Sequence, residues 1–143
     1  MTEKAMNRPD SNRTVEKAVE ILRREVPGLI AVYRHGSFGT PEELPTSDLD
    51  LAILAAAPVD PVARLALVAS LGEAVGREVD LADLRAASTV FRARVVAEGA
   101  CVFEGDPSAR AAFEMRALSA YAMLNEERAG ILEDIEKRGS IHG

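Results

Sequence analysis

Apolar residues recur at helical spacing in four stretches of this 143-residue chain. In the first stretch they are 4, 3 and 4 positions apart, and they are Val15, Val19, Leu22 and Val26. This spacing predicts one apolar helix face, with Thr14 as a suitable N-cap and Pro27-Gly28 as the end of the helix. The other predicted helices lie between Asp60-Pro61 and Gly76, over residues 88–98, and over residues 108–137.

Four short apolar runs between polar breaks predict β-strands. They cover residues 29–33, 49–54, 78–82 and 100–103. Because strands and helices alternate along the chain, we predict an α/β fold with a single domain over residues 14–138. The polar residues 1–13 are predicted to form a flexible arm, and residues 139–143 a tail.

The last predicted helix is long for a small sheet. Its apolar face consists of Phe113, Ala117, Tyr121, Leu124, Ile131 and Ile135. The pattern breaks near Arg128. Either this face packs entirely on the sheet, or part of it remains exposed as a surface for a partner or for oligomer formation.

Composition excludes several classes of protein. The net charge of −6 and the absence of tryptophan argue against direct nucleic-acid binding, which uses basic stripes and aromatic stacking. No apolar run is long enough to span a membrane, and residues 1–13 lack the apolar region of a signal peptide. The single cysteine, Cys101, is interpreted as a buried structural thiol, and it fits a cytoplasmic protein.

The chemistry of the chain is concentrated in Gly36-Ser37 and, ten residues later, Asp48-Leu49-Asp50. Side chains alternate along a strand, so Asp48 and Asp50 share a face, with their Cα atoms roughly 6.5–7 Å apart. Two like charges this close are unfavourable unless a proton or a cation neutralises them. Mg²⁺ prefers such carboxylate oxygens together with substrate phosphates. Gly36 permits close backbone approach to a phosphate, and Ser37 adds a hydroxyl donor.

Two further residues are candidates for the same site. Asp80 faces the same way as the first two acids if Val79 and Leu81 face the core. His35 precedes the Gly-Ser turn, and it is either a site residue or an ordinary polar strand end. On the strand that carries Asp50, the apolar residues Leu49, Leu51 and Ile53 are predicted to form the buried face.

With these residues identified, the chain resembles the minimal nucleotidyltransferases of the DNA polymerase β superfamily, and it looks most like the antitoxins encoded beside HEPN-domain toxins. The matching residues are Gly36-Ser37, Asp48-x-Asp50 and Asp80, and the element order agrees over nearly the whole chain. The resemblance implies a polymerase-β-like nucleotidyltransferase fold with a mixed sheet of about four strands, flanking helices and a long C-terminal helix.

The resemblance also implies an activity, namely ATP-dependent protein adenylyltransfer. Asp48, Asp50 and Asp80 would be the catalytic and metal-binding residues for Mg²⁺, and Gly36 and Ser37 would bind the phosphates of ATP. Asp80 would also help to activate the acceptor hydroxyl. The implied reaction transfers AMP from ATP to a tyrosine of a partner HEPN toxin and releases pyrophosphate.

One departure from the family pattern concerns the turn. Relatives often continue Gly-Ser as x-Ala-Arg-Gly, whereas this chain has Phe38-Gly39-Thr40-Pro41. The arginine that could contact phosphate is therefore absent. Substitutes from elsewhere in the chain would be Arg34, Arg77, Arg92 or Arg94, and Asp83 is an alternative third acid.

Two other functions remain open at this point. One is a non-catalytic antitoxin of the same fold, which would neutralise its partner by binding alone. The altered turn favours this reading, whereas the three acids oppose it. The other is a nucleotidyltransferase for a small molecule, and the absence of a second substrate domain opposes that reading.

Overall fold

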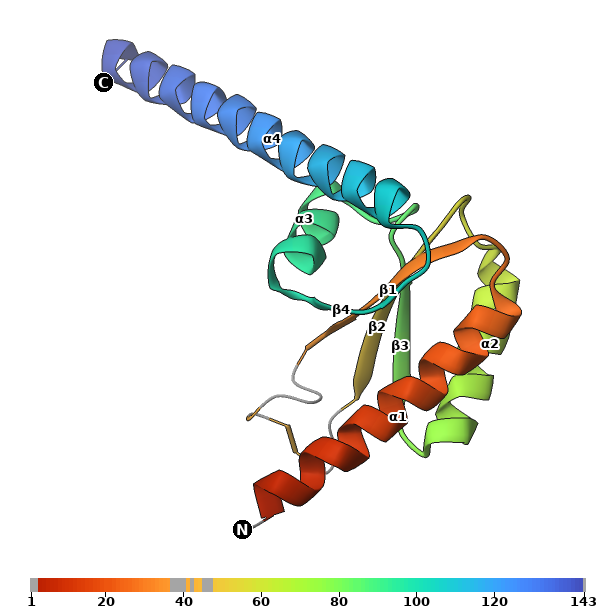
Figure 1. Cartoon of the computed structure of the whole chain (residues 1–143). Coiled ribbons are helices and arrows are strands. Elements are labelled where there is room, and N and C mark those ends of the chain that lie inside the picture. Colours follow the sequence, from red (N-terminus) through yellow and green to blue (C-terminus); the bar gives the residue numbers. More distant parts are fainter. Residues whose placement is uncertain (1–2, 37–40, 42, 45–47, 143) are drawn as a thin grey trace.

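The computed structural model describes the backbone of residues 3–36, 41, 43–44 and 48–142, and the side chains of residues 11–36, 41, 43–44 and 48–138. This part of the chain contains helices and strands in alternation (Figure 1). In chain order they are α1 (Glu3–Glu25), β1 (Leu29–His35), β2 (Leu49–Ala55), α2 (Pro61–Val75), β3 (Val79–Asp83), α3 (Thr89–Glu98), β4 (Ala100–Glu104) and α4 (Pro107–His142).

The strands form one mixed sheet in the order β3-β2-β1-β4. β1 is antiparallel to both β2 and β4, whereas β2 and β3 are parallel. A parallel pair requires a crossover connection, and α2 supplies it between β2 and β3. The predicted mixed sheet with flanking helices and a long C-terminal helix is therefore confirmed.

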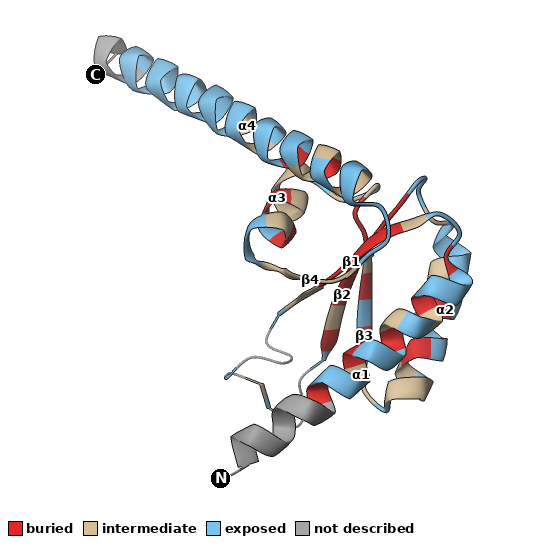
Figure 2. Cartoon of the chain, viewed as in Figure 1, coloured by how far each residue is buried: buried red, intermediate tan, exposed pale blue. Residues whose placement is uncertain are grey.

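Helices cover both faces of the sheet (Figure 1). On one face α1 and α2 pack on β2 residues Leu49, Leu51 and Ile53. On the other face α3 and α4 pack on Ala52 and Leu54, which are also fully buried. The prediction of a single buried face on β2 was thus incomplete, because Ala52 and Leu54, on the same face as Asp50, are also buried. β2 is accordingly buried along most of its length (Figure 2).

The helix ends follow the local signals in the sequence. The Asp60 carboxylate caps α2 by accepting a hydrogen bond from Ala63 N at 3.0 Å. Gly76 ends α2 in the left-handed region, with φ of 70°. Ser88 caps α3 by accepting a hydrogen bond from Phe91 N at 3.1 Å. These boundaries place β3 and α3 where the sequence predicted them.

The start of α1 differs from the prediction. The chain is helical from Glu3, so the N-cap at Thr14 is wrong, and residues 3–13 of the predicted arm are helical. Tertiary contacts explain part of the difference, because Ser11 is buried and donates a hydrogen bond to Glu43 Oε1 at 2.9 Å. Arg77 pairs with the other oxygen of Glu43 at 3.3 Å. The division into arm, domain and tail stays a prediction.

α4 is one continuous helix. It continues through Arg128, where the apolar spacing is interrupted, and reaches His142, so the predicted long C-terminal helix is confirmed. Its first turns lie against α3 and β1, and the rest projects away from the domain (Figure 1).

Candidate active site

Three strand ends bring the candidate residues together on one face of the sheet. In the strand register His35 of β1 pairs with Asp50 of β2, and Asp50 pairs with Asp80 of β3. Paired residues on neighbouring strands point to the same face, about 4.5–5.5 Å apart at Cβ. The row His35, Asp50, Asp80 therefore crosses the sheet on the side of α3. Asp48 directly precedes β2 and is exposed.

The close approach of Gly36 to Asp50 explains why this position is a glycine. Gly36 follows β1 with φ of +76°, a conformation that residues with a Cβ rarely adopt. A Cβ placed there would overlap Asp50 Oδ2 and lie 3.1 Å from Asp50 Cγ. The glycine thus leaves the space that the Asp50 carboxylate occupies. Ser37, the other predicted phosphate-binding residue, lies outside the described residues.

The electrostatics of Asp50 show that the acids interact. Burial raises the pKa of Asp50 above its ordinary value. The negative charges of Asp80 and Asp48 raise this pKa further, whereas His35 lowers it. The structure therefore brings all three predicted acids close enough for their charges to be coupled. Such mutual repulsion among acids is typical of sites that take up a cation or a proton.

The donor set fits a divalent cation with substrate phosphates. Within the described residues, no group of three His, Cys, Asp or Glu side chains is arranged to hold a metal ion. The acids present supply only oxygen atoms, which suits Mg²⁺, and Mg²⁺ is usually held by one or two carboxylates plus phosphates. A pair of adjacent acids, Asp50 and Asp80, beside a glycine turn meets that requirement.

The sequence left two roles open for His35, a site residue or an ordinary polar strand end. The structure places it beside the acids. Its ring lies edge-on against Phe91 of α3, with ring centroids 5.5 Å apart. Its Nε2 atom is buried and has no hydrogen-bond partner in the part of the chain that the structure describes. His35 therefore lines the candidate site next to Asp50. The only signal of this in the sequence is that His35 directly precedes Gly36.

Asp83, the alternative third acid, has a structural role. So do Arg92 and Arg77, two of the arginines that could have replaced the missing phosphate-contacting arginine. Asp83 is 8% exposed and accepts hydrogen bonds from Val59 N and Arg85 N at 2.8 and 3.0 Å. It is therefore a loop-fixing residue and not a third site acid. Arg92 donates to two backbone carbonyls at 2.7 Å, and Arg77 is paired with Glu43.

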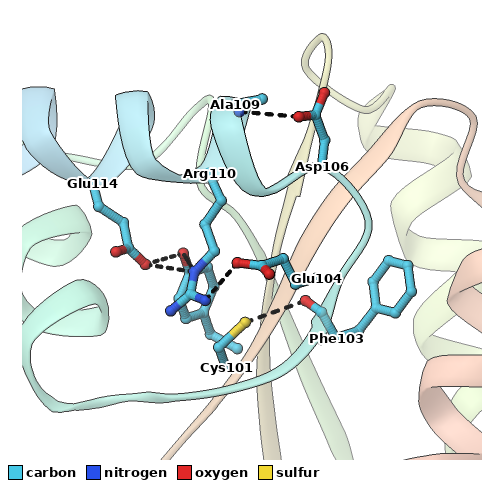
Figure 3. A network of polar contacts seen from close by, with 8 residues as sticks. Cys101, Phe103, Glu104, Asp106, Ala109, Arg110 and Glu114 are labelled. Atoms are coloured by element: carbon cyan, nitrogen blue, oxygen red, sulfur yellow. Dashed lines mark hydrogen bonds and ion pairs between the residues drawn. The ribbon is translucent and has the colours of Figure 1, made fainter.

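A polar network that sequence reasoning missed anchors α4 to the sheet (Figure 3). Arg110 donates to Glu104 Oε2 and to Glu114 Oε2, each at 2.8 Å. Tyr33 of β1 donates to the same Glu114 oxygen at 2.6 Å. Burial and the bond to Glu114 raise the pKa of Tyr33. Since Tyr33 lies two residues before His35, the network helps to fix the strand that forms one side of the site.

A cavity of about 700 Å³ lies elsewhere and is not this site. It is formed between the end of α1 and the start of α2, with Val26, Ala56 and Leu67 in its lining. It adjoins the opposite ends of β1 and β2 from Asp50. Its lining is mainly apolar and contains none of the three predicted acids.

The fold and the acids define the class of protein. Residues 16–108 match the family described as polymerase beta, nucleotidyltransferase, and the chain belongs to this family. The matched range contains every predicted site residue.

Within that family the chain is similar to minimal nucleotidyltransferase antitoxins. Protein adenylyltransferase MntA of Shewanella oneidensis is 36% identical over 119 residues, which cover 83% of this chain and 85% of the relative. A structure of a toxin–antitoxin with AMP-PNP matches with a TM-score of 0.75 at 35% identity, over 84% of this chain and 96% of that chain. A second match is the MNT antitoxin in complex with a tri-AMPylated Shewanella oneidensis HEPN toxin, with a TM-score of 0.74 at 34% identity, over 87% and 98% of the two chains. The resemblance stated from the sequence is thereby confirmed.

Proposed function

We propose that this chain is an antitoxin that neutralises a cognate HEPN toxin by transferring AMP from ATP to a tyrosine of that toxin. The observation that carries the proposal is the pairing of Asp50 with Asp80 beside Gly36, whose missing Cβ leaves room for the Asp50 carboxylate. The relatives support the reaction class, because one is named a protein adenylyltransferase and another is bound to an AMPylated toxin.

Asp50 and Asp80 would hold Mg²⁺ as the adjacent pair, with Asp48 as the third ligand once ATP and metal are bound, and Gly36 and Ser37 would hold the phosphates of ATP. Bound Mg²⁺ supplies positive charge at the attacking and leaving oxygens of an in-line displacement. Asp80 is exposed at the edge of the row, where an incoming hydroxyl can reach it. We therefore assign Asp80 the additional role of accepting the proton of the acceptor tyrosine.

The reaction balances as a simple displacement. The tyrosine oxygen forms a bond to the α-phosphorus of ATP, and the bond from that phosphorus to its bridging oxygen breaks. Pyrophosphate leaves with the electron pair, and the tyrosine proton passes to Asp80. The product is an AMP–tyrosine phosphodiester on the toxin.

The setting of the protein follows from the same proposal. No helix in the described part of the chain is long and apolar enough to cross a membrane. We propose a cytoplasmic location, which the single cysteine fits, and partners that are the toxin and ATP; the net charge of −6 argues against nucleic acid.

A labelling experiment tests the proposal. The chain is incubated with Mg²⁺, its HEPN toxin, and ATP labelled at either the α- or the γ-phosphate. We expect toxin labelling from α-labelled ATP only, with a mass gain of one AMP per transfer. Labelling from γ-labelled ATP would indicate a kinase instead. A stable complex without any label would support the non-catalytic antitoxin. Label on a small molecule alone would support the small-molecule nucleotidyltransferase.

A further inference from the structure

The distal half of α4 carries large apolar side chains that the described part of the chain leaves uncovered (Figure 2). Every residue from 125 to 138 is exposed. The large apolar residues there are Ile131, Leu132 and Ile135, which are 61, 64 and 58% exposed. Complete burial of one such side chain is worth about 1.5–3 kcal/mol, so a surface of this kind favours association.

These residues continue the same face that anchors α4 to its own domain. Phe113 and Ala117 are buried against α3 and the sheet, and Leu124 is half-buried where the helix leaves the domain. From Ala117 the next positions follow after 7, 7 and 4 residues, at Leu124, Ile131 and Ile135. At about 100° per residue they stay within about 40° of one another around the helix. We call Leu124, Ile131 and Ile135 the α4 stripe.

Charges beside the α4 stripe indicate what covers it. Arg128 lies next to the stripe, is exposed, and forms no ion pair with any carboxylate that the structure describes. Glu127 and Asp134 lie together along one flank, seven residues apart, and Arg138 on the same flank is ion-paired with Asp134 at 3.4 Å. The spacing of the stripe is that of a heptad seam, which binds another helix. Its occupant must therefore offer an apolar helix face and a carboxylate opposite Arg128.

A second copy of this chain does not meet these requirements. A parallel pair of α4 helices would place Arg128 against its own counterpart. An antiparallel pair would bring the flank with Glu127 and Asp134 against the same flank of the other copy. Like charges would meet in both arrangements, which opposes pairing, although the Arg138–Asp134 ion pair reduces the repulsion in the antiparallel one. The charge pattern thus favours a different protein over a homodimer.

We propose that the α4 stripe docks an apolar helical face of the HEPN toxin, with a carboxylate of the toxin opposite Arg128. This inference rests on the proposed function for the identity of the partner, and it adds the surface by which the chain holds its substrate. The distal half of α4 projects away from the domain (Figure 1), so a partner docked there would not cover the exposed Asp80.

Calorimetric titration of the full chain with the HEPN toxin tests the docking surface. Ile131→Asp is expected to weaken binding at least about 30-fold, the size of an interface hot spot. Ala129→Asp is the matched control, because it introduces the same charge about 160° away on the exposed helix. We expect it to bind within about twofold of wild type. Arg128→Glu should weaken binding, whereas Arg128→Lys should largely retain it. Ile131→Ser serves as a milder second variant, and helical circular dichroism verifies folding.

Three outcomes would contradict the docking proposal. Wild-type binding by folded Ile131→Asp, or equal weakening by Ala129→Asp, would show that the stripe is not the docking surface. A dimer of the chain alone that Ile131→Asp dissociates, with toxin binding unchanged, would assign the stripe to a second copy. Asp50→Asn separates this inference from the proposed function, because it should bind the toxin normally without AMP transfer. If wild type binds through the stripe but transfers no AMP, only the proposed function fails.

Discussion

Replacing Asp50 with asparagine should abolish AMP transfer and yet make the protein more stable. Asp50 is the middle residue of the row across the sheet, between His35 and Asp80. Asparagine keeps the size of the side chain and removes the charge that, in the proposed site, would bind Mg²⁺. Because the Asp50 carboxylate fills the space beside Gly36, a side chain of equal size at position 50 leaves no cavity and causes no overlap.

The size of the stability gain follows from the spacing of the acids. Two unit charges about 5 Å apart repel by about 0.8 kcal/mol in water and about 3 kcal/mol at the effective dielectric near a protein surface. Asp80 is exposed, so solvent screening places the gain near the lower value, at about 1 kcal/mol. For a domain of this size that corresponds to a rise in Tm of about 3–4 °C.

The gain should depend on pH in a direction fixed by the pKa of Asp50. That pKa is raised in the folded protein, so the folded state holds the proton more tightly than the unfolded state. The destabilisation from ionised Asp50 is absent below the unfolded pKa of about 3.9 and grows as pH rises through the folded pKa. The difference in Tm between wild type and Asp50→Asn should therefore be present at pH 7 and shrink toward pH 4.

Thermal unfolding with and without Mg²⁺, next to the labelling assay, measures all of these effects. Mg²⁺ at 100 times its Kd should stabilise wild type by about 2.7 kcal/mol and Asp50→Asn by clearly less. Transfer of labelled AMP by the variant at the wild-type rate would refute the assigned site. A variant less stable than wild type at pH 7 without metal would refute the argument from charge repulsion.

Three further predictions concern the site and its support. Asp80→Ala should retain more binding of a non-hydrolysable ATP analogue than Asp48→Ala while transferring little AMP, because we assign Asp80 to the attacking hydroxyl and Asp48 to the metal on the phosphates; equal loss in a calorimetric titration would contradict this division. Arg110→Met should lower the free energy of unfolding by about 1 kcal/mol in denaturant titrations, because the part-buried Glu114 carboxylate keeps only Tyr33 as a donor and the exposed Glu104 loses its ion pair, and an unchanged midpoint would show that the network is dispensable. Cys101, whose pKa is raised by burial, should react with a thiol reagent at pH 7 more slowly than free cysteine; faster reaction would mean that the thiol is not held as described.

The acids could be predicted from the sequence because their placement depends on local rules. Strand alternation puts Asp50 and Asp80 on one face of their strands, whatever else the fold does. The sequence did not show that β2 and β3 are neighbours, since strand order depends on tertiary packing. The register that pairs Asp50 with Asp80 appears only in the folded sheet. The same holds for His35, whose pairing with Asp50 turns an ordinary strand end into part of the site.

The polar network and the start of α1 could not be predicted, because both depend on contacts between residues far apart in the chain. Tyr33 and Glu114 are 81 positions apart, and no spacing rule connects them. Residues 3–13 are polar and include Pro9, which disfavours a helix interior. The helix nevertheless extends through them, and Ser11 is held by Glu43 from the loop that precedes β2.

α4 shows why one apolar pattern can have two different causes. An apolar stripe on a helix indicates a face that packs against something. Its spacing is the same whether that face packs on the chain's own sheet or on another protein. Sequence reasoning therefore left both alternatives open for the whole helix. The structure divides them at Leu124, since Phe113 and Ala117 are buried before it and Ile131 and Ile135 are exposed after it. The first half of α4 thus packs on its own domain, and the exposure of the second half is what motivates the proposed docking surface.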